Sequence, residues 1–164
     1  MSFGFSDFPI NRRSVVCGAV ILVALPASVA ATARKIPQVL FICQSGSVKS
    51  AVTRELFRKA AIARSIAVAA YSRGIIIEAH LSPALKAALA SEGIDPEREP
   101  LHKLERADLR RADVTVLFDP LPMGMRARRV HDWTDTGSFN QSFAIERPRL
   151  VARINALLDE IDMR

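Results

Sequence analysis

Aromatic residues and cysteines are scarce in this chain. Phe, Trp and Tyr together make up 6% of its 164 residues, and only two cysteines, Cys17 and Cys43, are present. Two cysteines exclude a disulfide-rich scaffold and cannot by themselves build a cysteine-type zinc site. Basic residues occur in no run longer than a doublet, and few rings are available to stack on bases. We therefore expect no nucleic-acid partner.

The chain also lacks an apolar run of the roughly 20 residues that a helix needs to span a membrane comfortably. Its longest run, residues 15–25, follows Arg12-Arg13 and ends before Pro26. A basic start, a short apolar run and the small residues that follow it are typical of an export signal. Residues 1–33 are thus predicted to be an export signal, or alternatively a membrane anchor that is not cleaved.

The two alternatives place the protein differently. Cleavage within residues 1–33 predicts a periplasmic protein, and Arg12-Arg13 is compatible with the twin-arginine route. An uncleaved segment would hold the protein at the inner membrane, which is the only membrane contact that we expect.

The rest of the chain, residues 37–164, has the composition of one folded domain. Hydrophobic residues make up 49% of the sequence and charged residues 24%, with a net charge of +6. Short apolar runs alternate with helical patterns, which predicts a three-layer αβα sandwich around a four-stranded parallel sheet. We expect strands at 38–42, 65–71, 114–118 and 129–133, with a turn at 72–74. Helices are expected after residue 48, after Ser82-Pro83, and around the apolar residues of 150–161.

The chemistry that we predict lies in a loop between the first strand and the first helix. A cysteine ends the strand, and a cation six residues later opens the helix. Backbone N–H groups at such a helix start form a cradle for a tetrahedral oxyanion, and they favour the thiolate of a nearby cysteine. The predicted oxyanion-binding residues are Gln44, Ser45, Gly46, Ser47, Val48, Lys49 and Ser50, with Cys43 as nucleophile. Taken alone, Cys43 could equally be a buried structural cysteine.

This loop resembles the signature of the low-molecular-weight protein tyrosine phosphatases and of the arsenate reductases that share their fold. The signature is a strand ending in C-x5-R-[ST], followed by a helix, and here it reads Cys43-QSGSV-Lys49-Ser50. The resemblance extends over residues 37–162. It implies a flavodoxin-like topology and hydrolysis of phosphoric monoesters through a phosphocysteine on Cys43, with no metal or organic cofactor.

Two departures make this a divergent version of the loop. Lys49 stands where the family has arginine, so a point charge replaces a planar fork that binds two oxygens at once. Gly46 stands where the family has an asparagine whose side chain braces the loop. Bracing must therefore come from elsewhere or be absent.

The resemblance also implies a general acid, which in the family is an aspartate in the loop before the last helix. By distance from that helix, Asp135 is the best match and Asp132 the second. Asp119-Pro120 ends the third predicted strand and is interpreted as a turn.

Several functions remain open on this basis. The first is a phosphatase that acts on a phosphorylated protein, on a small aryl phosphate, or on another tetrahedral oxyanion. The second is an oxyanion-binding module of the same fold that has lost turnover, a reading that Lys49 and Gly46 favour. An arsenate reductase-like thiol enzyme is the third, although no cysteine follows Cys43 to resolve a disulfide. His80, His102 and His131 lack metal-ligand spacing, so we expect no metal site.

Overall fold

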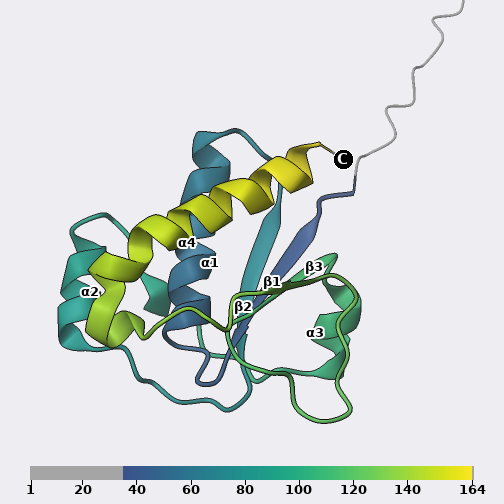
Figure 1. Cartoon of the computed structure of the whole chain (residues 1–164), viewed down its shortest axis with the longest axis horizontal. Coiled ribbons are helices and arrows are strands. Elements are labelled where there is room, and N and C mark those ends of the chain that lie inside the picture. Colours follow the sequence, from purple (N-terminus) through teal and green to yellow (C-terminus); the bar gives the residue numbers. More distant parts are fainter. Residues whose placement is uncertain (1–34, 164) are drawn as a thin grey trace, which may run out of the picture. The chain divides into compact units, whose positions relative to one another are not determined.

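A computed structural model describes residues 35–163; the predicted export signal or anchor, residues 1–33, lies outside them. The elements are β1 (Gln38–Cys43), α1 (Lys49–Ala63), β2 (Ala69–Gly74), α2 (Pro83–Ala90), the 3-10 helix η1 (Pro96–Arg98), α3 (Arg106–Arg111), β3 (Val114–Leu117), β4 (Val130–Asp132) and α4 (Phe139–Asp162) (Figure 1). The four strands are parallel in the order β2-β1-β3-β4. This confirms the predicted α/β fold and its flavodoxin-like strand order.

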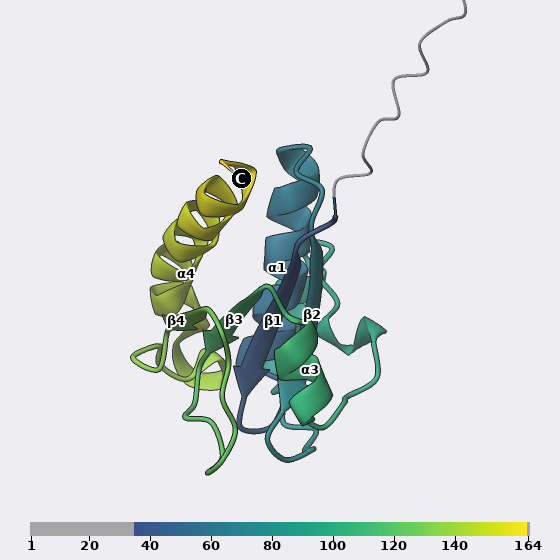
Figure 2. The same cartoon turned by 90° about the vertical axis from the view of Figure 1, so that its right-hand side faces the viewer.

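The central strand β1 divides its side chains between two layers. Val39 and Phe41 join the core beneath α1 and α4, whereas Leu40 and Ile42 pack against Leu109 of α3 and its neighbours. Figure 2 shows α1 and α4 on one side of the sheet and α3 on the other. Successive residues of a strand point to opposite faces, so a wholly apolar run is what a strand covered on both faces requires. Its last residue, Cys43, is carried to the carboxyl edge of the sheet.

The second strand lies later in the chain than the sequence predicts. The structure places it at Ala69–Gly74, so the predicted turn at 72–74 is strand instead. The apolar pattern of 65–71 misled the prediction because β2 is an edge strand whose polar residues have partners. Ser72 accepts a hydrogen bond from Arg54, and Arg73 pairs with Asp108. Ser65, with a φ of 55°, instead turns the chain away from the end of α1.

A buried arginine ties α1 to β2 and η1. Arg54 is 2% exposed. Its guanidinium donates to Ser72 Oγ at 2.8 Å and to the Pro96 carbonyl at 3.0 Å, and it pairs with Glu55 at 2.7 Å and Glu99 at 3.3 Å. Every face of the fork is therefore matched by an acceptor, as a buried charge requires.

Glu99→Gln should reduce the acid sensitivity of the fold. Partial burial would raise the pKa of Glu99, but the hydrogen bond from Arg58 and the charges of Arg54 and Arg58 outweigh it and hold the pKa below its ordinary 4.5. Such a carboxylate stabilises the fold above the unfolded pKa, and the stabilisation is lost as pH falls through the folded pKa. Because the Glu99 side chain is 38% exposed, solvent screening limits the effect near pH 7 to less than about 1 kcal/mol.

Urea unfolding between pH 7 and pH 3 measures this. The stability of the wild type should converge on that of Glu99→Gln below about pH 4.5. Glu97→Gln, which changes an exposed pair with Lys86 two residues before Glu99, serves as the matched variant and should keep the wild-type acid limb. A gap between the wild type and Glu99→Gln that persists at pH 3 would contradict the assignment.

Candidate functional site

The loop from Cys43 to Ser50, here called the Cys43 loop, runs from the end of β1 into α1. Gly46 has a φ of +77°, a left-handed conformation that folds the loop back over the sulfur. The residue before α1, Val48, provides no side-chain cap, and the first turn of the helix contains no acidic residue. The N–H groups of that first turn therefore face the loop, where an anion can accept hydrogen bonds from them.

The sulfur of Cys43 is surrounded by hydrogen-bonding groups. The Gly46 N–H donates to Sγ at 3.2 Å, and Ser50 Oγ lies 3.0 Å from Sγ. Ser50 Oγ is also 3.2 Å from the Gly46 carbonyl, to which its single proton can be donated. When Cys43 is a thiolate, that proton can turn to the sulfur instead. Two donors can thus stabilise negative charge on Cys43.

The Cys43 loop is braced by main-chain atoms of the segment after β2. Three amides of that segment, from Ile75, Ile76 and Glu78, donate in turn to the carbonyls of Cys43, Gln44 and Ser45 at 3.1, 2.9 and 3.3 Å. The loop thus continues the β1–β2 pairing beyond the strands themselves. Main-chain hydrogen bonds thus brace the loop, for which Gly46 offers no side chain.

Two glycines make that close approach possible. A Cβ atom on Gly46 would lie 2.9 Å from the amide nitrogen of Gly74. A Cβ atom on Gly74 would lie 2.2 Å from the Ile76 carbonyl oxygen and 2.8 Å from the carbonyl carbon of Ser45. All of these neighbours are backbone atoms, which cannot rotate aside as a flexible side chain can.

Lys49 reaches across the pocket to the loop before α4. Its Nζ donates to the Thr136 carbonyl at 3.2 Å. The ammonium therefore sits at the mouth with one of its three donors used, and two remain for a ligand.

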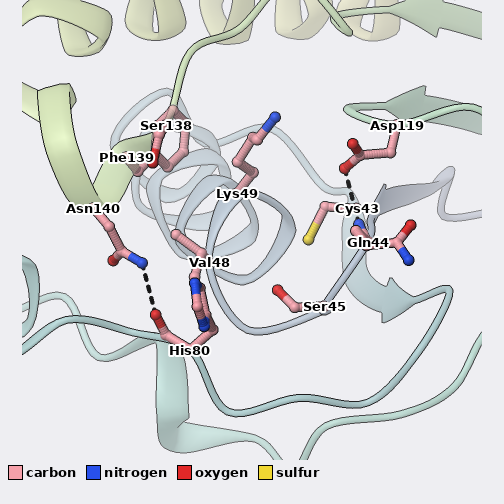
Figure 3. A pocket seen from close by; sticks show the side chains of 10 residues that line it. All are labelled: Cys43, Gln44, Ser45, Val48, Lys49, His80, Asp119, Ser138, Phe139 and Asn140. Carbon is pink, nitrogen blue, oxygen red and sulfur yellow. Dashed lines mark hydrogen bonds between the residues drawn. The ribbon is translucent and has the colours of Figure 1, made fainter.

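An open pocket of about 150 Å³ lies over the sulfur. Its lining residues are Cys43, Gln44, Ser45, Val48, Lys49, His80, Asp119, Ser138, Phe139 and Asn140 (Figure 3). The structure thus brings Cys43 together with four of the predicted loop residues. The other three, Gly46, Ser47 and Ser50, are buried beneath them. The small volume, with Lys49 in the wall, suits an anion the size of phosphate.

Asn140, at the start of α4, fixes the wall of the pocket opposite Asp119. Its amide donates to the His80 carbonyl at 2.7 Å and accepts from the Ser82 N–H at 2.9 Å. The His80 N–H in turn donates to Ser47 Oγ at 3.1 Å. This wall is consequently joined to both the Cys43 loop and α4.

Neither of the predicted acids is among the residues that line the pocket. Asp135 is exposed and pairs with Arg149 and with Arg153, the latter at 2.8 Å. The hydrogen bond from Arg153 holds the pKa of Asp135 below its ordinary value. Asp132, at the end of β4, accepts from the Thr134 hydroxyl and amide, and that hydroxyl likewise lowers the pKa of Asp132.

The pocket instead contains Asp119 and His80, which the sequence reasoning did not select. Asp119 Oδ2 accepts the Gln44 N–H at 2.9 Å. The rule that ligands bind beyond the carboxyl ends of parallel strands could have identified Asp119, because it follows β3, the neighbour of β1. No sequence pattern marks His80, since its position depends on the path of the connection between β2 and α2.

Trp133 packs in the core and does not wall the pocket. It is 5% exposed, and its ring lies against Phe41 and Phe118. Within residues 35–163, no group of three or more His, Cys, Asp or Glu side chains is arranged to hold a metal ion. None of the helices in this part of the chain is long and apolar enough to cross a membrane.

The sequence matches no family model and no curated protein. Solved structures do match. A low-molecular-weight protein tyrosine phosphatase from T. tengcongensis is 18% identical, with 76% of this chain and 99% of that chain covered and a TM-score of 0.60. A thioredoxin-dependent arsenate reductase from Corynebacterium glutamicum is 20% identical, with 80% and 64% covered and a TM-score of 0.61.

A third match is the arginine phosphatase YwlE, in a variant whose active-site serine is phosphorylated. It is 17% identical, with 76% of this chain and 95% of that chain covered and a TM-score of 0.60. At such low sequence identities, the similarity to these structures shows a shared fold. Residues 35–163 therefore have the fold of the low-molecular-weight protein tyrosine phosphatases and arsenate reductases.

Proposed function

We propose that this protein hydrolyses phosphoric monoesters through a phosphocysteine on Cys43. The observation that carries the proposal is the arrangement around the sulfur: Cys43 Sγ lies 3.2 Å from the Gly46 N–H and 3.0 Å from Ser50 Oγ, at the uncapped start of a 15-residue helix. These groups can donate hydrogen bonds to a negative charge on the sulfur, and the same helix end attracts the phosphate dianion that Cys43 would attack.

Each step uses groups of the site. The Cys43 thiolate attacks phosphorus, the S–P bond forms, and the bond from phosphorus to the leaving oxygen breaks while a carboxylic acid protonates that oxygen. Amides of the Cys43 loop and Lys49 bind the three equatorial oxygens. Water then attacks phosphorus and gives a proton to the carboxylate formed in the first step, while the S–P bond breaks. The Ser50 hydroxyl stabilises the departing thiolate, since it is already within hydrogen-bond distance.

The proposed substrate is a phosphorylated protein or a small aryl phosphate. The solved structures of this fold include phosphatases and arsenate reductases by name, which supports a tetrahedral oxyanion as ligand. For arsenate reduction this chain would need an external thiol, because Cys43 is the only cysteine after Cys17.

A second candidate is an oxyanion-binding module without turnover. The contact between Lys49 Nζ and the Thr136 carbonyl favours it, because this contact holds the cation toward the loop before α4. Such a module would bind phosphate and release it unchanged.

Trapping of the covalent intermediate tests the proposal. Purified full-length protein is mixed with a ³²P-labelled aryl phosphate and quenched in acid, and we expect label on the peptide that contains Cys43. Cys43→Ala should abolish the label, while Cys17→Ser should retain it. Alanine is preferred to serine because a serine hydroxyl can itself be phosphorylated, as in the YwlE variant. Phosphate binding in titration calorimetry without any label would instead establish the binding module.

A further inference from the structure

We infer that Arg153 is a positioning residue for Lys49 and that it acts through Thr136. The inference rests on the proposed function in one respect, which is that the pocket binds a phosphoryl group. A lysine presents its charge on a flexible four-carbon stem, whereas the planar fork of an arginine is preorganised. A lysine that meets an anion in a defined geometry therefore needs a further contact that holds its ammonium in place.

The contact that holds Lys49 is the Thr136 carbonyl, which accepts a hydrogen bond from Nζ at 3.2 Å. Lys49 is the first residue of α1, and Thr136 belongs to the loop between β4 and α4. In Figure 3 the Lys49 side chain points toward the side of the pocket that Ser138 and Asp119 border. The position of the ammonium thus depends on where this loop holds the carbonyl.

Thr136 is itself fixed at two further atoms. It is 6% exposed, and its N–H donates to the Trp133 carbonyl at 3.0 Å, which closes a β-turn. Its Oγ1 accepts a hydrogen bond from the Arg153 guanidinium at 3.1 Å. Thr136 therefore stands between two cations, with its hydroxyl oxygen bonded to Arg153 and its carbonyl bonded to Lys49.

Arg153 is held firmly enough to be the fixed end of this chain of contacts. Its guanidinium carbon lies 5.7 Å from the centre of the buried Trp133 ring, and one of its nitrogens pairs with Asp135 at 2.8 Å. The Arg153 side chain is 22% exposed. A guanidinium that stacks on a ring and pairs with a carboxylate has little freedom left, so it can fix the Thr136 hydroxyl.

Calorimetric titration of the full-length protein with inorganic phosphate tests the inference. Thr136→Val removes the hydroxyl and leaves the carbonyl, and Arg153→Met removes the donors and keeps an apolar stem. Each change should weaken phosphate binding by about 2–10-fold, which is the cost of immobilising a flexible side chain upon binding. The two changes together should weaken it no more than one alone, and neither should have an effect in a Lys49→Ala background.

Arg149→Met is the matched control. Arg149 carries the same charge on the same helix and also pairs with Asp135. Among the residues that the structure describes, however, only Arg153 donates to the Thr136 hydroxyl. Arg149→Met should therefore keep the phosphate affinity of the wild type. Urea unfolding identifies the folded variants, and Thr136→Val, which changes no charge, carries the test if Arg153→Met does not fold.

A second measurement needs no ligand. Acetic anhydride acetylates free amines, so the hydrogen bond to Thr136 should slow the reaction at Lys49. The rate at Lys49 should rise by about 2–10-fold in Thr136→Val and Arg153→Met, the equivalent of one intramolecular hydrogen bond, and stay unchanged in Arg149→Met. Peptide mass spectrometry measures it against Lys59, whose Nζ donates to the Glu92 carbonyl at 2.7 Å and lies outside the pocket.

Four results of the titration would overturn the inference. Unchanged affinity in both variants shows that the contact does not position Lys49 for the anion. Equal weakening in the Lys49→Ala background shows that Thr136 and Arg153 act on the loop amides instead. Equal losses in Arg149→Met and Arg153→Met show an effect of charge alone. Tighter phosphate binding in Thr136→Val shows that the contact keeps Lys49 away from the ligand.

Failure of the proposed function is distinguishable from failure of this inference. A wild type that binds phosphate but gives no label on Cys43 contradicts the phosphatase proposal, and the titration of the variants still decides the role of Arg153. If the wild type binds no phosphate, the acetylation rates decide it, and rates at Lys49 that are equal in the wild type and the variants overturn the inference.

Discussion

Gly74→Ala is expected to lower kcat about 10²-fold or more, because a misplacement of catalytic groups by about 1 Å has an effect of that size. The new methyl group would lie 2.2 Å from the Ile76 carbonyl oxygen and 2.8 Å from the Ser45 carbonyl carbon. Gly74 cannot retreat, since its N–H donates to the His102 carbonyl at 3.0 Å and its carbonyl accepts the Leu104 N–H at 2.8 Å. The Cys43 loop must therefore move.

The same substitution should destabilise the fold by about 1–3 kcal/mol, the usual range for overpacking. Urea unfolding and steady-state kinetics with an aryl phosphate measure the two effects. Gly93→Ala is the matched variant, because Gly93 has a φ of +70° but open space around its Cα and no role in the pocket. It should lose stability and keep its kcat. A folded Gly74→Ala protein with the kcat of the wild type would show that the loop does not depend on this contact.

Lys49→Arg is expected to raise kcat by about one to two decades. A planar guanidinium can donate two parallel hydrogen bonds to phosphoryl oxygens, which an ammonium cannot. The additional charged hydrogen bond is worth about 1.5–3 kcal/mol in the transition state. The gain belongs in kcat, since the ground state already has the loop amides and a positive charge. Lys49→Ala should weaken phosphate binding.

Lys59→Arg provides the comparison for this experiment. Lys59 lies on the same helix, and its Nζ likewise donates to a backbone carbonyl, that of Glu92, at 2.7 Å. It lies outside the pocket, so its substitution should leave kcat unchanged. If Lys49→Arg is folded and its kcat is flat or lower, the lysine is no handicap, and the loop is suited to another oxyanion or to binding alone.

The sequence predicted the elements whose signals are local. The apolar run predicts β1, and the spacing of Val52 and Leu56 predicts α1. A strand buried on both faces is apolar throughout, whereas a helix buried on one face repeats its apolar residues every three or four positions. The boundaries of β2 were wrong because its polar residues are satisfied by Arg54 and Asp108, which come from distant segments. Nothing in the sequence around Arg54 distinguishes it from a surface arginine.

The site divides in the same way. Cys43 and the predicted oxyanion-binding residues follow from one strand–loop–helix segment, and the structure places Cys43 and four of them around one pocket. The acid could not be read from spacing alone, because three aspartates follow or lie near the carboxyl ends of neighbouring strands. Their separation depends on loop paths and on ion pairs such as those of Asp135 with Arg149 and Arg153. The assignment of Asp135 stays a prediction.

The main-chain bracing of the Cys43 loop has a practical consequence for redesign. Hydrogen bonds from Ile75, Ile76 and Glu78 engage carbonyls that every amino acid possesses, so they are indifferent to the side chains at 44 and 45. A combinatorial library at 44 and 45, with Gly46 and Gly74 held fixed, should therefore retain the shape of the anion cradle in most of its members. Ligand preference can then be altered by substitution without rebuilding the backbone that presents the amides.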